Sequence, residues 1–143
     1  MKLIFSCAVG FALIIISLQG CDTDKREFIK TAQTTFEKII KGDPSAAQGI
    51  AWPEIRIGDE EIGRSFMALN TAYEKSAFQT GTIARLAREY SAKNWTLQKV
   101  QNWRVESHGL ESAVVVADAP GGKIVYNMQK RGGDKKIVWM QIK

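Results

Sequence analysis

Apolar residues recur at helical spacing just after residue 24. Asp24 is a suitable helix N-cap and Glu27 its capping-box partner. Gly42 can adopt a left-handed conformation and Pro44 cannot continue a helix, so we expect a helix over residues 25–41. The residues that share its apolar face are Phe28, Ile29, Ala32, Phe36, Ile39 and Ile40.

The following stretch, residues 43–63, is less regular. A helical turn is expected at residues 45–48, and Trp52-Pro53 and Gly58-Asp59 mark breaks. Four apolar side chains here need cover from solvent, namely Ile50, Trp52, Ile55 and Ile57.

Two further helical patterns follow. The first carries Ile62, Phe66, Leu69 and Tyr73. The second starts at about Ser76 and carries Phe78, Ile83, Leu86, Ala87 and Tyr90. No strong stop residue separates the two patterns, so residues 74–77 either break two helices or bend one.

From Asn94 the pattern changes to a period of two, which indicates strands. The expected strands are 102–107, 113–117, 124–129 and 137–142, with turns at 107–110, 119–122 and Gly132-Gly133. Two of these strands are apolar at consecutive positions and therefore present apolar residues to both faces. Simple alternation places Val114 and Val116 opposite Val115, and it places Ile137 and Trp139 opposite Val138, Met140 and Ile142.

Helices followed by antiparallel strands predict an α+β fold. We expect N-terminal helices packed on one face of a curved antiparallel sheet of about four strands. Residues 25–143 are long enough for one hydrophobic core, so a single domain is expected.

The N-terminus has the pattern of an export signal. Met1-Lys2 is basic, and the apolar run of residues 3–18 is short for a membrane span. Leu18-Gln19-Gly20-Cys21 resembles the lipobox of bacterial lipoproteins. This resemblance implies a signal peptide over residues 1–20 and a lipidated Cys21, with residues 21–24 as a short tether to the bilayer.

Membrane attachment through Cys21 would be by diacylglycerol and further acyl chains such as palmitate. Asp22 resembles the enterobacterial signal that retains lipoproteins in the inner membrane. The expected location is therefore the cell envelope, at the periplasmic face of the inner membrane. The inner leaflet of the outer membrane is the alternative.

The element order resembles the nuclear transport factor 2-like, or cystatin-like, superfamily. The likeness rests on that order, on the stretch from Ile50-Ala51-Trp52 to Ile62-Gly63, and on the closing segment from Asp134 to Trp139. It implies a cone formed by a helix lying in a curved sheet. It also implies that an acid or base inside the cone could make the protein a hydrolase or isomerase.

Cysteine content and charge restrict the function classes. The chain contains two cysteines, Cys7 inside the signal and Cys21, so the mature protein would have no disulfide or thiolate metal site. The net charge is +5, and removal of Lys2 with the signal leaves +4. This excess suits anionic headgroups or cell-wall polymers. No nucleic-acid motif is present, and no cofactor is expected.

Few residues qualify as catalysts or metal ligands. His108 is the single histidine and falls in an expected turn, where an exposed imidazole without a catalytic role is favoured. Asp59, Glu60 and Glu61 complement a helix N-terminus and lack the spacing of a calcium loop, so no metal site is expected.

Binding residues are easier to nominate. Trp95, Trp103 and Trp139 either line a ligand cavity or belong to the core, and Met140 is a candidate partner contact. Cations flank the last hairpin and form either a solvated turn or a contact for anionic lipid, namely Lys130, Arg131, Lys135 and Lys136.

The favoured function is a lipid-anchored, non-enzymatic binding module for a protein partner or small ligand, in an accessory, immunity or exclusion role. We expect a second copy or another protein to bind the sheet face that the helices leave uncovered. A hydrolase or isomerase that uses the cone interior is the alternative.

Overall fold

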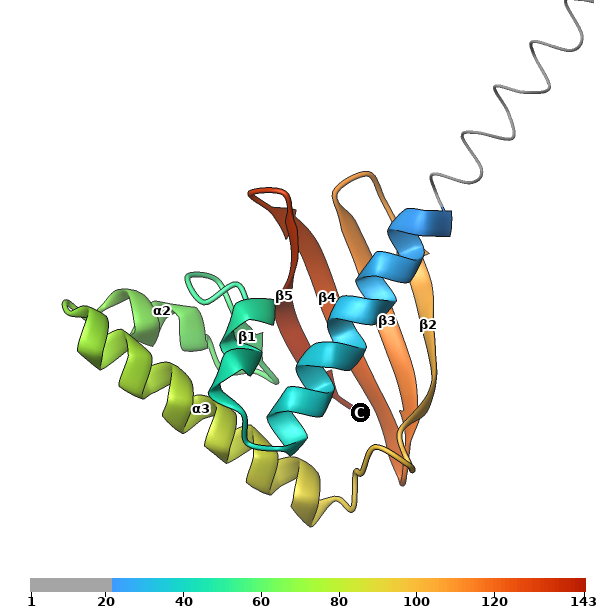
Figure 1. The fold of residues 1–143 in the computed structure, drawn as a ribbon, viewed down its shortest axis with the longest axis horizontal. Coiled ribbons are helices and arrows are strands. Elements are labelled where there is room, and N and C mark those ends of the chain that lie inside the picture. The colour runs from blue at the N-terminus through green and yellow to red at the C-terminus, as the bar shows by residue number, and fades with distance from the viewer. Residues whose placement is uncertain (1–21) are drawn as a thin grey trace, which may run out of the picture.

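The helices of residues 22–143 lie on one side of a single curved sheet. The structure is a computed structural model and describes residues 22–143, so the expected signal peptide and Cys21 lie outside the described residues. The sheet has five strands in the order β1-β5-β4-β3-β2. Figure 1 shows the N-terminal helix crossing one face of this sheet, with α2 and α3 beside it. The expected α+β class is confirmed.

The N-terminal helix, residues 22–40 of the described chain, buries the predicted apolar stripe. Phe28, Ala32, Phe36 and Ile39 are at most 2% exposed. The helix ends as predicted, because Gly42 has φ +66° and its amide donates to the carbonyl of Ile39.

The expected tether of residues 22–24 is helical instead. The proposed N-cap role of Asp24 is therefore wrong. Its carboxylate lies beside cationic side chains of the sheet, at salt-bridge distance from Lys130 and Lys135. These tertiary contacts are between residues about a hundred positions apart and leave no signal in local sequence.

The predicted helical turn is the 3₁₀ helix η1, Pro44–Gly49. Asp43 caps it by accepting a hydrogen bond from the Ser45 amide at 2.9 Å. The chain then forms the short strand β1, Arg56–Ile57, which pairs in parallel with the last strand. The four apolar residues that needed cover are all at most 6% exposed, namely Ile50, Trp52, Ile55 and Ile57.

The α2 and α3 helices, Ile62–Met67 and Ala72–Ala92, separate earlier than the sequence suggested. Thr71 caps α3 through a capping box with Glu74, so residues 74–77 neither break nor bend a helix. Tyr73 lies in the first turn of α3 and is 83% exposed. Its predicted place on the apolar face of the preceding helix is wrong.

The remaining strands are β2 (Gln101–His108), β3 (Ser112–Ala119), β4 (Gly122–Arg131) and β5 (Asp134–Ile142). They form antiparallel pairs as predicted. The parallel strand β1 was not predicted, so the sheet is mixed and has five strands. The β4–β5 turn uses Gly132 and Gly133, with φ of +58° and +87°, which suits a primed hairpin turn.

A register shift between Asn127 and Met128 changes the faces of β5. Asn127 pairs with Trp139 but Met128 pairs with Ile137, so an extra residue interrupts the alternation. Ile137 and Met140 are both fully buried on the helix-covered face. The predicted grouping of Ile137 with Trp139 is therefore wrong.

The space between helix and sheet is packed with aromatic side chains. The ring centroid of Phe36 lies 5.5 Å from that of Trp103 and 5.6 Å from that of Tyr90. The hydroxyls of Tyr90 and Tyr126 are 3.0 Å apart, and burial raises the pKa of Tyr90 to about 12. Because aromatic side chains fill this space, candidate binding surfaces lie mainly on the exterior of the molecule.

Candidate functional site

Asp24 gathers side chains from three strands at the start of the described helix. Its Oδ2 lies 2.8 Å from Nε2 of His108, and its Oδ1 lies 3.1 Å from Nζ of Lys130 and 3.1 Å from Nζ of Lys135. These partners belong to β2, β4 and β5 respectively. The cluster therefore fixes the helix to the sheet at this end.

The electrostatics of the Asp24 cluster favour its charged form. Partial burial raises the pKa of Asp24, but hydrogen bonds with His108, Lys135 and Lys130 outweigh it and bring the pKa to about 2. Burial lowers the pKa of Lys135, and the contact with Glu27 at 2.6 Å together with Asp24 reverses this, for a net rise. Asp24 and Lys135 are thus both ionised at neutral pH.

His108 is not the exposed imidazole that the sequence suggested. Its side chain is 15% exposed, bonded to Asp24, and its ring packs edge-on against Phe28 with centroids 5.9 Å apart. A His–Asp pair also occurs in catalytic dyads. Here the same carboxylate is shared with two lysines, which is an arrangement suited to holding elements together.

The four cations near the last hairpin are engaged within the molecule. Lys130 and Lys135 bind Asp24, and Nε of Arg131 lies 2.6 Å from Oε1 of Glu54. Nζ of Lys136 donates to the backbone carbonyl of Gln48. Of these four, Lys136 has no carboxylate partner among residues 22–143.

The proposed tryptophan contacts do not share a cavity. Trp95 is 3% exposed and its Nε1 donates to the carbonyl of Pro120 at 2.9 Å. Trp103 packs on Phe36 beneath the N-terminal helix. Trp139 lies on the opposite face of the sheet, beside its pairing partner Asn127 of β4.

Met140 is fully buried on the core side, where it pairs with Tyr126. A partner cannot reach it without unfolding the sheet edge. The candidate contact at Met140 is therefore corrected to a core position, and the bulge in β5 is the physical reason.

The outer sheet face contains a groove of about 380 Å³ lined in part by Val114, Val138 and Trp139. The Arg56 guanidinium lies 4.7 Å from the centre of the Trp139 ring, and Nε1 of Trp139 donates to the carbonyl of Gly58 at 2.9 Å. No residue of a helix in the described chain lines this groove. This face remains open to a partner.

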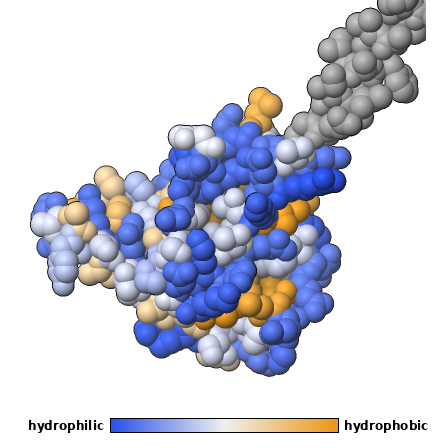
Figure 2. All heavy atoms as spheres, in the orientation of Figure 1, coloured by the Kyte–Doolittle hydropathy of each residue, from blue (hydrophilic) through white to orange (hydrophobic). Residues whose placement is uncertain are grey.

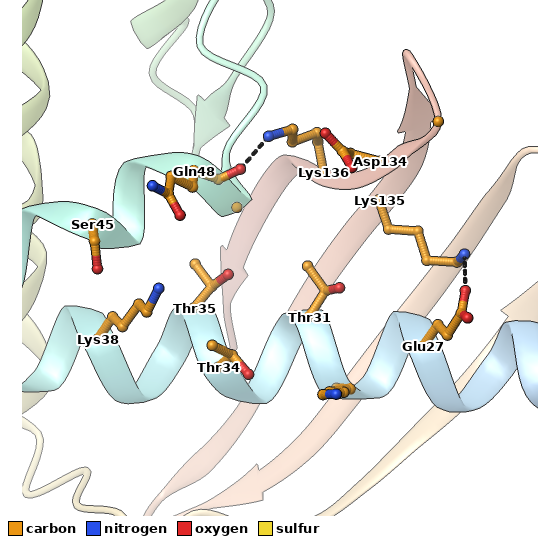
Figure 3. A pocket seen from close by; sticks show the side chains of 13 residues that line it. Glu27, Thr31, Thr34, Thr35, Lys38, Ser45, Gln48, Asp134, Lys135 and Lys136 are labelled. Carbon is orange, nitrogen blue, oxygen red and sulfur yellow. Dashed lines mark hydrogen bonds and ion pairs between the residues drawn. The ribbon is translucent and has the colours of Figure 1, made fainter.

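A larger, polar groove of about 600 Å³ lies between the N-terminal helix, η1 and the β4–β5 hairpin. Figure 3 shows threonine side chains and Lys38 of the helix on one wall, with Ser45, Gln48 and Lys136 across from them. Gly49 forms part of the opposite wall where it meets Thr35, and a Cβ there would lie 2.0 Å from Oγ1 of Thr35. Figure 2 shows a mostly hydrophilic surface around this helix.

The sequence pattern did not predict this groove, because among the cations only those beside the last hairpin stood out as candidates. A signal was available, because Lys30, Thr34 and Lys38 are spaced i, i+4, i+8 and so share one face of a helix. What the sequence lacks is the opposite wall. That wall comes from residues up to about a hundred positions away.

The acidic run is engaged with arginines. Glu60 lies 3.0 Å from Arg85 and Glu61 lies 2.8 Å from Arg64. Within residues 22–143, no group of three or more His, Cys, Asp or Glu side chains is arranged to hold a metal ion. Over the same range, no helix has the length and apolarity needed to cross a membrane.

Comparisons with protein-family models, with curated proteins and with solved structures found no match to this chain.

Proposed function

We propose that this protein is a cell-envelope lipoprotein, anchored through Cys21, that acts as a non-enzymatic binding module. The observation that supports this best is the aromatic packing between helix and sheet around Phe36, Tyr90 and Tyr126. A ligand is thereby directed to outer surfaces, which include the open sheet face and the polar groove. An accessory, immunity or exclusion role suits such a module.

The anchor would hold the domain close to the bilayer. Residue 22 is already helical, so a lipidated Cys21 leaves no spacer before the fold. The β2–β3 and β4–β5 turns lie at the same end of the molecule as the start of this helix (Figure 1). Leu110 in the β2–β3 turn is 89% exposed and would face the headgroups. Asp22 favours the periplasmic face of the inner membrane.

Metabolic labelling with a palmitate analogue tests the anchor. We expect wild-type protein to take up label and to fractionate with membranes, and Cys21→Ser to lose both properties. Cys7→Ser is the matched control, since it removes the other cysteine and should label normally. Label that persists in Cys21→Ser would refute lipidation at this residue.

The alternative is a hydrolase or isomerase, and the one observation in its favour is the contact between His108 and Asp24. A binding module predicts that His108→Ala retains the phenotype of the wild-type gene when it complements a deletion. A folded His108→Ala protein that fails to complement would favour acid–base catalysis instead.

A further inference from the structure

The polar groove is lined by three lysines that form no ion pair within the described residues, Lys30, Lys38 and Lys136. Among the described residues, no hydrogen bond or ion pair engages the ammonium groups of Lys30 and Lys38, and Lys136 meets only a neutral carbonyl. Two carboxylates line the groove, Glu27 and Asp134. Glu27 is already paired with Lys135, so three cations face one unpaired acid.

Hydroxyl groups stand among these cations. Thr31, Thr34 and Ser45 line the groove, and Figure 3 shows Ser45 opposite the helix wall. The nearby Asp43 accepts from the Ser45 amide and attracts Lys38 and Lys41 electrostatically, but it forms no ion pair with either lysine. Ammonium groups and hydroxyls are donors that suit an oxyanion with several acceptor oxygens.

We propose that this groove binds a phosphate ester. Lysine is a point-charge donor that tolerates the tetrahedral geometry of phosphate. The net charge, +5 for the full chain and +4 without the signal, attracts anions to the molecule. The proposal rests on the proposed binding function and names its ligand class. It does not depend on lipidation of Cys21 or on the sheet face.

The phosphate ester has two possible sources, a phospholipid headgroup or a soluble metabolite. With a rise of about 1.5 Å per residue, Lys30 lies about 12 Å and Lys38 about 24 Å along the helix from residue 22. A headgroup beside an anchored domain would therefore meet Lys30 first. A soluble ester would reach both lysines.

The test uses the purified full chain, both in solution and with nanodiscs of neutral phosphatidylcholine, titrated with glycerol 3-phosphate by calorimetry. We expect saturable binding that weakens with added salt, and a loss of at least about tenfold in affinity for Lys30→Gln/Lys38→Gln. Arg88→Gln/Lys99→Gln is the matched control, because it also removes two cations, and neither of these exposed residues lines the groove. This control should bind like wild type.

A second arm identifies the source. If the ligand is a headgroup, phosphatidylglycerol in the nanodisc will compete with glycerol 3-phosphate. If the ligand is a soluble ester, phosphatidylglycerol will not compete. Both results support the site. Absence of saturable binding overturns the proposal. Equal affinity of the Lys30/Lys38 variant and wild type, or equal losses in both double variants, does so as well. The labelling of Cys21 fails or succeeds independently of these results.

Discussion

At the scale of single residues, Asp24 has a role that its sequence context conceals. It comes shortly after the export-like signal and directly before an apolar helical face. A position directly before such a face is typical of an N-cap. In the folded chain its carboxylate contacts His108 and forms ion pairs with Lys130 and Lys135. These contacts make it the main electrostatic link between helix and sheet at that end.

Asp24→Asn should reduce the free energy of unfolding by about 1–2 kcal/mol at pH 7. The pKa of Asp24 is depressed from 3.8 to about 2, so its contribution is complete above pH 4 and is lost as the pH falls from 4 towards 2. Urea unfolding followed by tryptophan fluorescence at pH 7 and pH 3 measures this.

Glu106→Gln is the control for the Asp24 experiment, since Glu106 is exposed on β2. Its stability should match wild type at both pH values within about 0.5 kcal/mol. A stability gap between wild type and Asp24→Asn that is as large at pH 3 as at pH 7 would show that the carboxylate charge is not the cause.

At the scale of elements, capping decides where α2 gives way to α3. The amide of Glu74 donates to Oγ1 of Thr71 at 3.1 Å, and the Glu74 carboxylate accepts from the Thr71 amide at 2.9 Å. The apolar spacing runs through this point without interruption. The cap therefore overrides the periodicity that suggested a continuous helix or a later break.

Thr71→Ala should destabilise the protein by about 1 kcal/mol, because it removes the side-chain acceptor for the α3 N-terminus. Hydrogen exchange should show faster exchange confined to the first turn of α3. Ser76→Ala, an exposed substitution inside the same helix, serves as control and should change stability by less than about 0.5 kcal/mol. Equal effects of the two substitutions would contradict the capping role.

At the scale of the whole molecule, the sheet has two unlike faces. The helices cover the face that carries Tyr126 and Met140, both fully buried. The other face presents Val138 and Trp139 beside Asn127, with no helix lining its groove in the described chain. Apolar residues on an uncovered face often mark an interface.

A photo-crosslinker at position 138 should capture a second copy or an envelope protein, whereas one at the exposed Lys99 should not. A substitution that introduces a charge tests the same surface. Trp139→Lys in a chain with a crosslinker at position 138 should reduce the crosslinked product at least about tenfold. Met140→Lys is unsuitable because it would bury a charge in the core. A chain that remains uncrosslinked at position 138 and monomeric in light scattering would rule out this interface.

The sequence alone determined much of the architecture. Local periodicity and turn chemistry marked the N-terminal helix through Gly42, the hairpin at Gly132-Gly133 and the α+β class, because each depends on neighbouring residues. It also supplied the lipobox pattern at Cys21, which remains a prediction.

Which side chains meet depends on how the whole chain packs. The β5 bulge moved Met140 into the core, since one extra residue reverses every later position in a strand. The partners of Asp24 and the second wall of the groove that faces Lys30 and Lys38 come from distant strands. Such contacts arise from packing and register across the whole chain, and local spacing does not encode them.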